Sequence, residues 1–221
     1  MIARHIHHAL AQVQELQQQL LEKQRFKGYS GRARAATGCL ALLAAIVMSA
    51  DSFPQKASWH AVGWGIVFLL GAAINFGALI YWFFTDPDDI SRGKTAGRDV
   101  RRLKPLIDAF GPLFVGAVLT FVFLYEGQHR LLPGMWMCLF GLANLASRHV
   151  LPRAIFLVGL FYIICGTACL LCPDISFTDP WPTGIVFFVG EWAGGWILHY
   201  DNVTNASFNQ LIGRLLGREE P

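Results

Sequence analysis

Long apolar runs alternate with short polar segments along most of the chain. The runs that are almost free of charge are residues 35–50, 59–84, 109–125, 131–147, 154–172 and 181–200. The hydrocarbon core of a bilayer is about 30 Å thick and is crossed by roughly 20 helical residues, with about 17 to 25 tolerated. The pattern therefore predicts an all-α polytopic membrane bundle, in which residues 35–200 form six transmembrane helices.

The charged residues support this class. The 221 residues include 18 Lys and Arg and 15 Asp and Glu, and 54% of the chain is hydrophobic. Glu191 is the single charged residue inside the six predicted spans. A bilayer imposes such segregation because charge is costly in hydrocarbon, and the composition excludes a disordered or fibrous protein.

The basic residues also predict an orientation. Sixteen of the 18 lie in residues 1–34, 85–108, 148–153 and 201–221, while the opposite connections carry Lys56 and Arg130. Short cytoplasmic segments are enriched in Lys and Arg, so both termini are expected in the cytoplasm of a bacterial inner membrane, with 201–221 as a cytoplasmic tail. No signal peptide is expected. The modest basic excess then reflects topology and anionic lipid, and no nucleic-acid partner is expected.

Residues 1–34 are expected to form a cytoplasmic amphipathic helix and a linker. Apolar residues recur at three- and four-residue spacing in residues 3–27, namely Ile6, Ala9, Leu10, Val13, Leu16 and Leu20. Such a helix lies on a membrane surface or docks against a partner. The bilayer is thus the expected partner, with a homo-oligomer or a protein partner as the alternative role of this helix.

Glu191 is the first candidate for function because it lies near the middle of the last span. An ionised carboxylate there should face the bundle, be protonated or pair with a donor. Gly190 and Gly194 flank it in a G-xxx-G pattern that favours close approach of a neighbouring helix. Asn75 and Asn144 are the expected intramembrane partners, with Thr120 in the third span, and no histidine or basic residue is expected at the same depth. The carboxylate then serves either in a proton or cation relay, in a polar contact to a ligand, or as structural glue.

Other chemical signals are weak. Asp86, Asp88 and Asp89 form an acidic cluster that suits Mg²⁺ and a lipid phosphate, although a helix cap explains it as well. Three cysteines, Cys165, Cys169 and Cys172, share one face of the fifth span near Cys138, and we expect them to pack as small apolar residues, with Cys172 the oxidisable one. No nucleotide, zinc-protease or nucleophile-elbow motif occurs, and no cofactor is expected.

Two stretches carry a family resemblance. The first runs from Phe26-Lys27-Gly28-Tyr29 into Thr37-Gly38-Cys39-Leu40-Ala41-Leu42. The second comprises Ala146-Ser147-Arg148, Leu151-Pro152-Arg153 and Phe161-Tyr162, followed by Pro180-Trp181 and Gly184. They resemble a loosely defined group of uncharacterised bacterial inner-membrane proteins with a polar N-terminal helix and about six spans. The resemblance implies the fold and the location, and it carries no functional residues.

Three functions are compatible with these features. The absent catalytic motifs and short outer connections favour a non-enzymatic sensing, scaffolding or regulatory membrane component. A small transporter or proton-coupled carrier built on Glu191 is the alternative. A Mg²⁺-dependent lipid-modifying enzyme using Asp86, Asp88 and Asp89 is the third.

Overall fold

A computed structural model describes residues 30–85, 104–147 and 151–204, and these residues are helical with short connections. The helices are α2 (Gly31–Met48), α3 (Ala57–Thr85), α5 (Lys104–Tyr125), α6 (Leu132–Ala146), α7 (Ile155–Leu171) and α8 (Trp181–Thr204), with a 3₁₀ turn, η2 (His129–Leu131), before α6. No strand occurs in these ranges, so the all-α prediction is confirmed there. The expected N-terminal amphipathic helix, the tail after residue 204, and Asp86, Asp88 and Asp89 lie outside the described residues.

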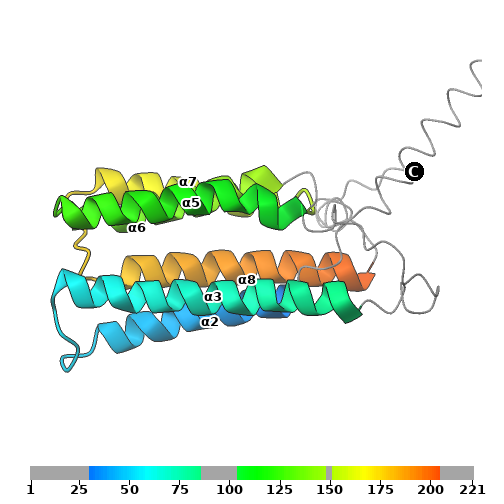
Figure 1. Cartoon of the computed structure of the whole chain (residues 1–221), viewed down its shortest axis with the longest axis horizontal. Helices are drawn as coiled ribbons and strands as arrows, with labels where there is room; N and C mark the ends of the chain where they lie inside the picture. The colour runs from blue at the N-terminus through cyan, green and yellow to red at the C-terminus, as the bar shows by residue number, and fades with distance from the viewer. Residues whose placement is uncertain (1–29, 86–103, 148–150, 205–221) are drawn as a thin grey trace, which may run out of the picture.

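The six helices form two layers (Figure 1). One layer holds α2, α3 and α8, and the other holds α5, α6 and α7. The segments 49–56, 126–131 and 172–180 lie at one end of the bundle, which we call the hairpin end. The helix α2 begins and α8 ends at the opposite end, which we call the terminal end. Successive helices are therefore antiparallel.

Helix boundaries follow local chemistry. The hydroxyl oxygen of Ser30 accepts a hydrogen bond from Ala33 N at 3.3 Å and caps α2, which consequently begins four residues before the apolar run that predicted it. Gly127 has a φ of 70°, a left-handed conformation that favours glycine, and it ends α5 before η2. The N–H of Gln128 closes this turn on Phe123 O at 2.8 Å.

Glycine seams join one pair of helices in each layer. Between α6 and α7, a Cβ atom on Gly134 or on Gly166 would lie 2.7 Å from the carbonyl oxygen of the other. The same reciprocity joins Gly141 and Gly159, at 2.7 and 3.0 Å. In the other layer, a Cβ on Gly195 of α8 would lie 2.6 Å from Gly31 O of α2. Small residues thus let antiparallel backbones touch, as in helix pairs of membrane proteins.

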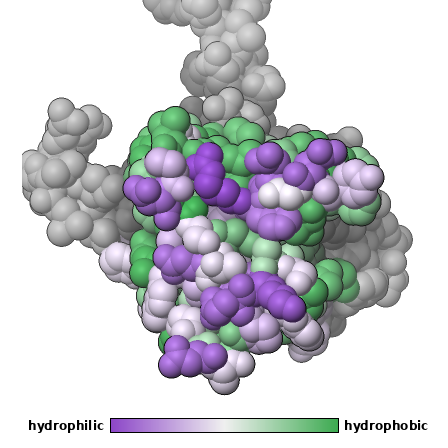
Figure 2. Space-filling view, turned by 90° about the vertical axis from the view of Figure 1, so that its left-hand side faces the viewer, coloured by the Kyte–Doolittle hydropathy of each residue, from purple (hydrophilic) through white to green (hydrophobic). Residues whose placement is uncertain are grey.

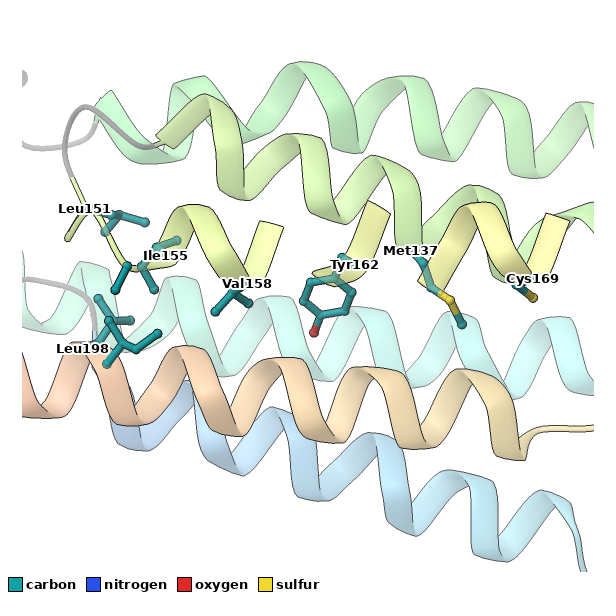
Figure 3. Close-up of a cluster of buried hydrophobic side chains, with 9 residues drawn as sticks. Met137, Leu151, Ile155, Val158, Tyr162, Cys169 and Leu198 are labelled. Atoms are coloured by element: carbon teal, nitrogen blue, oxygen red, sulfur yellow. The ribbon is translucent and has the colours of Figure 1, made fainter. Parts of the chain in front are cut away.

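The largest core cluster lies where α7 meets α6 and α8 (Figure 3). Its centre is Tyr162, which is completely buried and points from α7 toward α8. The centroid of the Phe140 ring lies 5.1 Å from that of Tyr162 in an edge-to-face contact, and the centroid of the Phe187 ring lies 5.3 Å from it in a tilted contact. This aromatic cluster is one of the few places where the two layers pack together.

The outer surface of the helices is strongly apolar, while the hairpin end is polar. Figure 2 views the hairpin end and shows hydrophilic residues gathered on it and hydrophobic residues along its flanks. Leu69 of α3, Phe121 of α5, Leu157 of α7 and Trp196 of α8 are more than half exposed. Two of the described helices, Gly31–Met48 and Ala57–Tyr81, are long and apolar enough to cross a membrane, and Phe110–Tyr125 and Ile155–Leu171 are shorter apolar segments.

Candidate functional site

A buried ion pair joins α2 to α8. Glu191 is 2% exposed and Arg34 is 4% exposed. Arg34 Nη2 lies 3.0 Å from Glu191 Oε1, and Arg34 Nε donates to Oε1 at 3.2 Å and to Oε2 at 3.1 Å. The two charges therefore compensate each other inside the protein, with more than one charge-assisted hydrogen bond.

Two further side chains extend this pair across the layers. Arg34 Nη2 donates to Asn144 Oδ1 of α6 at 2.7 Å, and the hydroxyl of Tyr162 in α7 donates to Glu191 Oε1 at 3.1 Å. Arg34, Asn144, Tyr162 and Glu191 form what we call the polar cluster. One residue comes from each of four helices, so the polar cluster ties the α2–α8 pair to the α6–α7 pair.

Glycines on α8 make room for the polar cluster. A Cβ on Gly190 would lie 2.6 Å from Tyr162 Cε2, and a Cβ on Gly194 would lie 2.7 Å from Arg34 Nε. On the facing helix, a Cβ on Gly38 would lie 3.0 Å from Glu191 Cβ. The G-xxx-G pair therefore serves the site directly, because any larger residue would displace the tyrosine or the arginine.

The expectation that no basic residue shares the depth of Glu191 is wrong. The apolar run starts at residue 35 and therefore predicts Arg34 in the linker, but the Ser30 cap starts α2 early enough to place Arg34 in its first turn. One signal was present in the sequence. The buried residues of α2 recur at three, four and seven positions, and Arg34 shares this face with small residues, namely Gly31, Gly38, Ala41 and Ala45. Tyr162 was also missed, since a single tyrosine in an apolar run looks like an ordinary packing residue.

The other predicted site residues have separate partners. Asn75 Nδ2 of α3 donates to Thr37 Oγ1 at 2.8 Å and to Gly71 O at 3.0 Å, and no bond to Glu191 is present. Thr120 Oγ1 accepts from Trp136 Nε1 at 2.8 Å and donates to Gly116 O at 2.7 Å. The structure thus brings Asn144 to the polar cluster, through Arg34, and places Asn75 and Thr120 elsewhere.

The five cysteines are free thiols. Cys169 is buried and Cys172 is exposed at the hairpin end, while Cys138 Sγ lies 4.0 Å from Thr167 Oγ1. Within the described residues no group of three or more His, Cys, Asp or Glu side chains is arranged to hold a metal ion.

A cavity of about 470 Å³ lies between the two layers, next to the polar cluster. Its lining comes from five helices: α2, α3, α5, α6 and α8. Arg34, Asn144 and Glu191 border it toward the terminal end, and Trp136 borders it nearer the hairpin end. In the described part of the chain α3 packs on α2 and α5 packs on α6, but α3 and α5 do not pack against each other as a helix pair. The cavity is therefore flanked by two helices that do not close over it.

The polar atoms in the cavity wall are largely paired within the protein. Thr37 and Asn75 bond to each other, as do Thr120 and Trp136. The hydroxyl of Ser147 donates to Ala143 O at 3.0 Å. The remaining wall is mostly apolar, so the cavity offers a hydrophobic environment of the size typical of small-molecule sites, which is about 300 to 1,000 Å³.

This arrangement suits binding better than proton or cation transfer. The Glu191 oxygens already accept from Arg34 and Tyr162, so a mobile cation would have to displace a guanidinium at 3.0 Å. Comparisons with protein-family models, curated proteins and solved structures found no match. The resemblance to bacterial six-span inner-membrane proteins stays a prediction.

Proposed function

We propose that the protein is a six-span integral membrane protein of the bacterial inner membrane, with both termini cytoplasmic. The exposed apolar side chains on α3, α5, α7 and α8 support this, because a soluble protein rarely exposes so much contiguous apolar surface. Among the described residues, the charged side chains of segments 49–56, 126–131 and 172–180 lie at the hairpin end, where headgroups and water would meet them. The sixteen-to-two distribution of basic residues supports the orientation.

We further propose that it acts without catalysis, as a sensing or regulatory component that binds a bilayer-soluble ligand between its layers. The observation that carries this proposal is the 470 Å³ cavity, which is apolar along its length and bordered at one end by the polar cluster. A ligand in this position contacts both layers at once. Its presence would therefore bias the spacing of the layers, which is the property that a sensor needs.

The two alternatives have less support. A proton-coupled carrier would use Glu191, but Arg34 compensates that carboxylate within hydrogen-bonding distance. A Mg²⁺-dependent enzyme would use Asp86, Asp88 and Asp89, which lie outside the described residues. Docking of a partner or a second copy through residues 1–34 remains compatible with ligand binding.

Two glycines of α3 provide a matched test. An added Cβ meets no atom within 4 Å at either Gly65 or Gly77, but Gly65 lines the cavity and Gly77 does not. We expect wild-type protein, extracted gently from membranes and examined by native mass spectrometry, to carry a bound molecule. Gly65→Phe should lose most of it, while Gly77→Phe should retain it.

A wild-type protein with no bound molecule, or equal retention by both variants, would contradict binding in the cavity. Circular dichroism and size-exclusion chromatography show whether each variant folds. Ala117→Phe on α5 fills the cavity from the opposite wall, and Val118→Phe on the outer face is its control.

A further inference from the structure

The charge balance of the cavity restricts what it can hold. Arg34 is the basic residue in the wall, and Glu191 neutralises it at 3.0 Å. Thr37, Asn75, Thr120 and Trp136 use their donors on one another or on backbone carbonyls. A cavity with neither net charge nor many unpaired donors is complementary to an uncharged, apolar occupant, since a buried charge would lack a partner.

The shape of the cavity restricts the occupant further. On α3 its lining residues run from Ala61 to Phe76, which corresponds to about 22 Å at 1.5 Å per residue. A volume of about 470 Å³ lies in the range of small-molecule sites, which is about 300 to 1,000 Å³. The lining is therefore elongated and mostly apolar.

The side of the bundle offers an entry from lipid. Phe68 and Leu69 of α3 line the cavity and are also 50% and 67% exposed on the outer surface. Leu113 and Ala117 line it from α5, which does not pack against α3. In the proposed membrane orientation, both lips of this opening face hydrocarbon.

We propose that the cavity binds one acyl chain of a membrane phospholipid, which enters sideways between α3 and α5. This inference rests on the proposed binding function and names its ligand. A single saturated chain suits the elongated apolar lining, the opening toward lipid and the absence of net charge. The phospholipid headgroup then stays outside the cavity, at the level of the surrounding leaflet.

A photoreactive lipid tests the proposal. The purified full chain is reconstituted in phosphatidylcholine vesicles that contain a small fraction of a phosphatidylcholine with a diazirine on one 16-carbon chain. After irradiation, peptide mass spectrometry maps the adducts. We expect adducts on Trp64, which lines the cavity and is only 6% exposed, as well as on Leu157 and Ile164, which are exposed on the outer face of α7.

Variants separate the cavity from the outer surface. Gly65→Phe and Ala117→Phe should each reduce the Trp64 adduct at least fivefold and leave the Leu157 and Ile164 adducts unchanged. Gly77→Phe and Val118→Phe should change none of them. Excess lysophosphatidylcholine with a 16-carbon chain should compete for Trp64, and the 6-carbon analogue should not.

Three outcomes would overturn the proposed ligand. One is the absence of a Trp64 adduct in the wild type, and another is a Trp64 adduct that survives both cavity-filling variants. The third is a native mass spectrum in which the molecule displaced by Gly65→Phe is a rigid polycyclic compound or a free fatty acid, in which case the binding function stands and the phospholipid assignment fails. A wild type that binds nothing refutes both proposals.

Discussion

Replacing Glu191 with leucine should lower the free energy of unfolding by about 3 to 5 kcal/mol, because it removes the carboxylate that compensates a buried guanidinium. Arg34 would lose its hydrogen bonds to both carboxylate oxygens, at 3.0 to 3.2 Å. Its hydrogen bond to Asn144 Oδ1, at 2.7 Å, would remain. Tyr162 would keep a longer contact to Phe187 O at 3.4 Å. Arg34→Met should cost a similar amount, since it strands the carboxylate.

The double variant Arg34→Met/Glu191→Leu should be more stable than either single variant. Removing both charges leaves two neutral groups short of a bond, Asn144 Oδ1 and the Tyr162 hydroxyl, at about 1 to 3 kcal/mol in total. Replacement of a whole buried ion pair by apolar residues of similar volume is often neutral or stabilising. The two substitutions should therefore couple by at least about 2 kcal/mol.

Equilibrium unfolding in mixed micelles, followed by far-UV circular dichroism, provides the four free energies of this cycle. Arg153→Met serves as a control because Arg153 is exposed, and it should change the free energy of unfolding by no more than about 0.5 kcal/mol. Additive effects, with each single variant costing less than about 1 kcal/mol, would refute the buried and mutually compensated pair.

Two further predictions concern the glycine seams and the topology. Gly141→Leu should lower the free energy of unfolding by about 1 to 3 kcal/mol or prevent folding, because its Cβ would lie 2.7 Å from Gly159 O. Gly111→Leu is the control, since an added Cβ there meets no atom within 4 Å, and it should be tolerated in the same unfolding titration. In whole cells, a membrane-impermeant maleimide should label Cys172 in a variant that keeps this cysteine alone. A variant that keeps only the buried Cys169 is the control and should react only after denaturation. An unlabelled Cys172 in intact cells would contradict a hairpin end that faces outward.

The distribution of apolar residues was sufficient to locate the helices, because hydrogen-bonded helices are the natural state of long apolar segments. The helix α8 (Trp181–Thr204) contains the last predicted run, and α7 (Ile155–Leu171) lies inside the fifth. The exact ends depended on caps that hydropathy does not register. The start of α2 is the important case, because the Ser30 cap places Arg34 inside the helix, whereas hydropathy places it in the linker.

The depth of a residue along its helix does not determine its contacts, because the rotation of the helix about its axis decides which neighbour the side chain faces. Position within the spans predicts both Asn75 and Asn144 as partners of Glu191. Asn144 faces Arg34 across the layers, whereas Asn75 faces Thr37 within its own layer. The cavity could not be predicted from the sequence. It results from α3 and α5 not packing against each other, and no local sequence pattern records the distance between two such helices.

The contacts between the two layers differ from the contacts within each layer. Within the layers, reciprocal glycines bring together the backbones of α6 and α7 and those of α2 and α8, which leaves these pairs little freedom to move. Between layers, the polar cluster and the aromatic rings around Tyr162 supply contacts on one side, and the cavity occupies the other. On the proposed function, an acyl chain in the cavity acts on the weaker of the two junctions. Because Arg34 and Glu191 both line the cavity and hold this junction, occupancy and layer spacing depend on the same side chains. On the proposed function, this dependence lets the protein respond to the lipid around it.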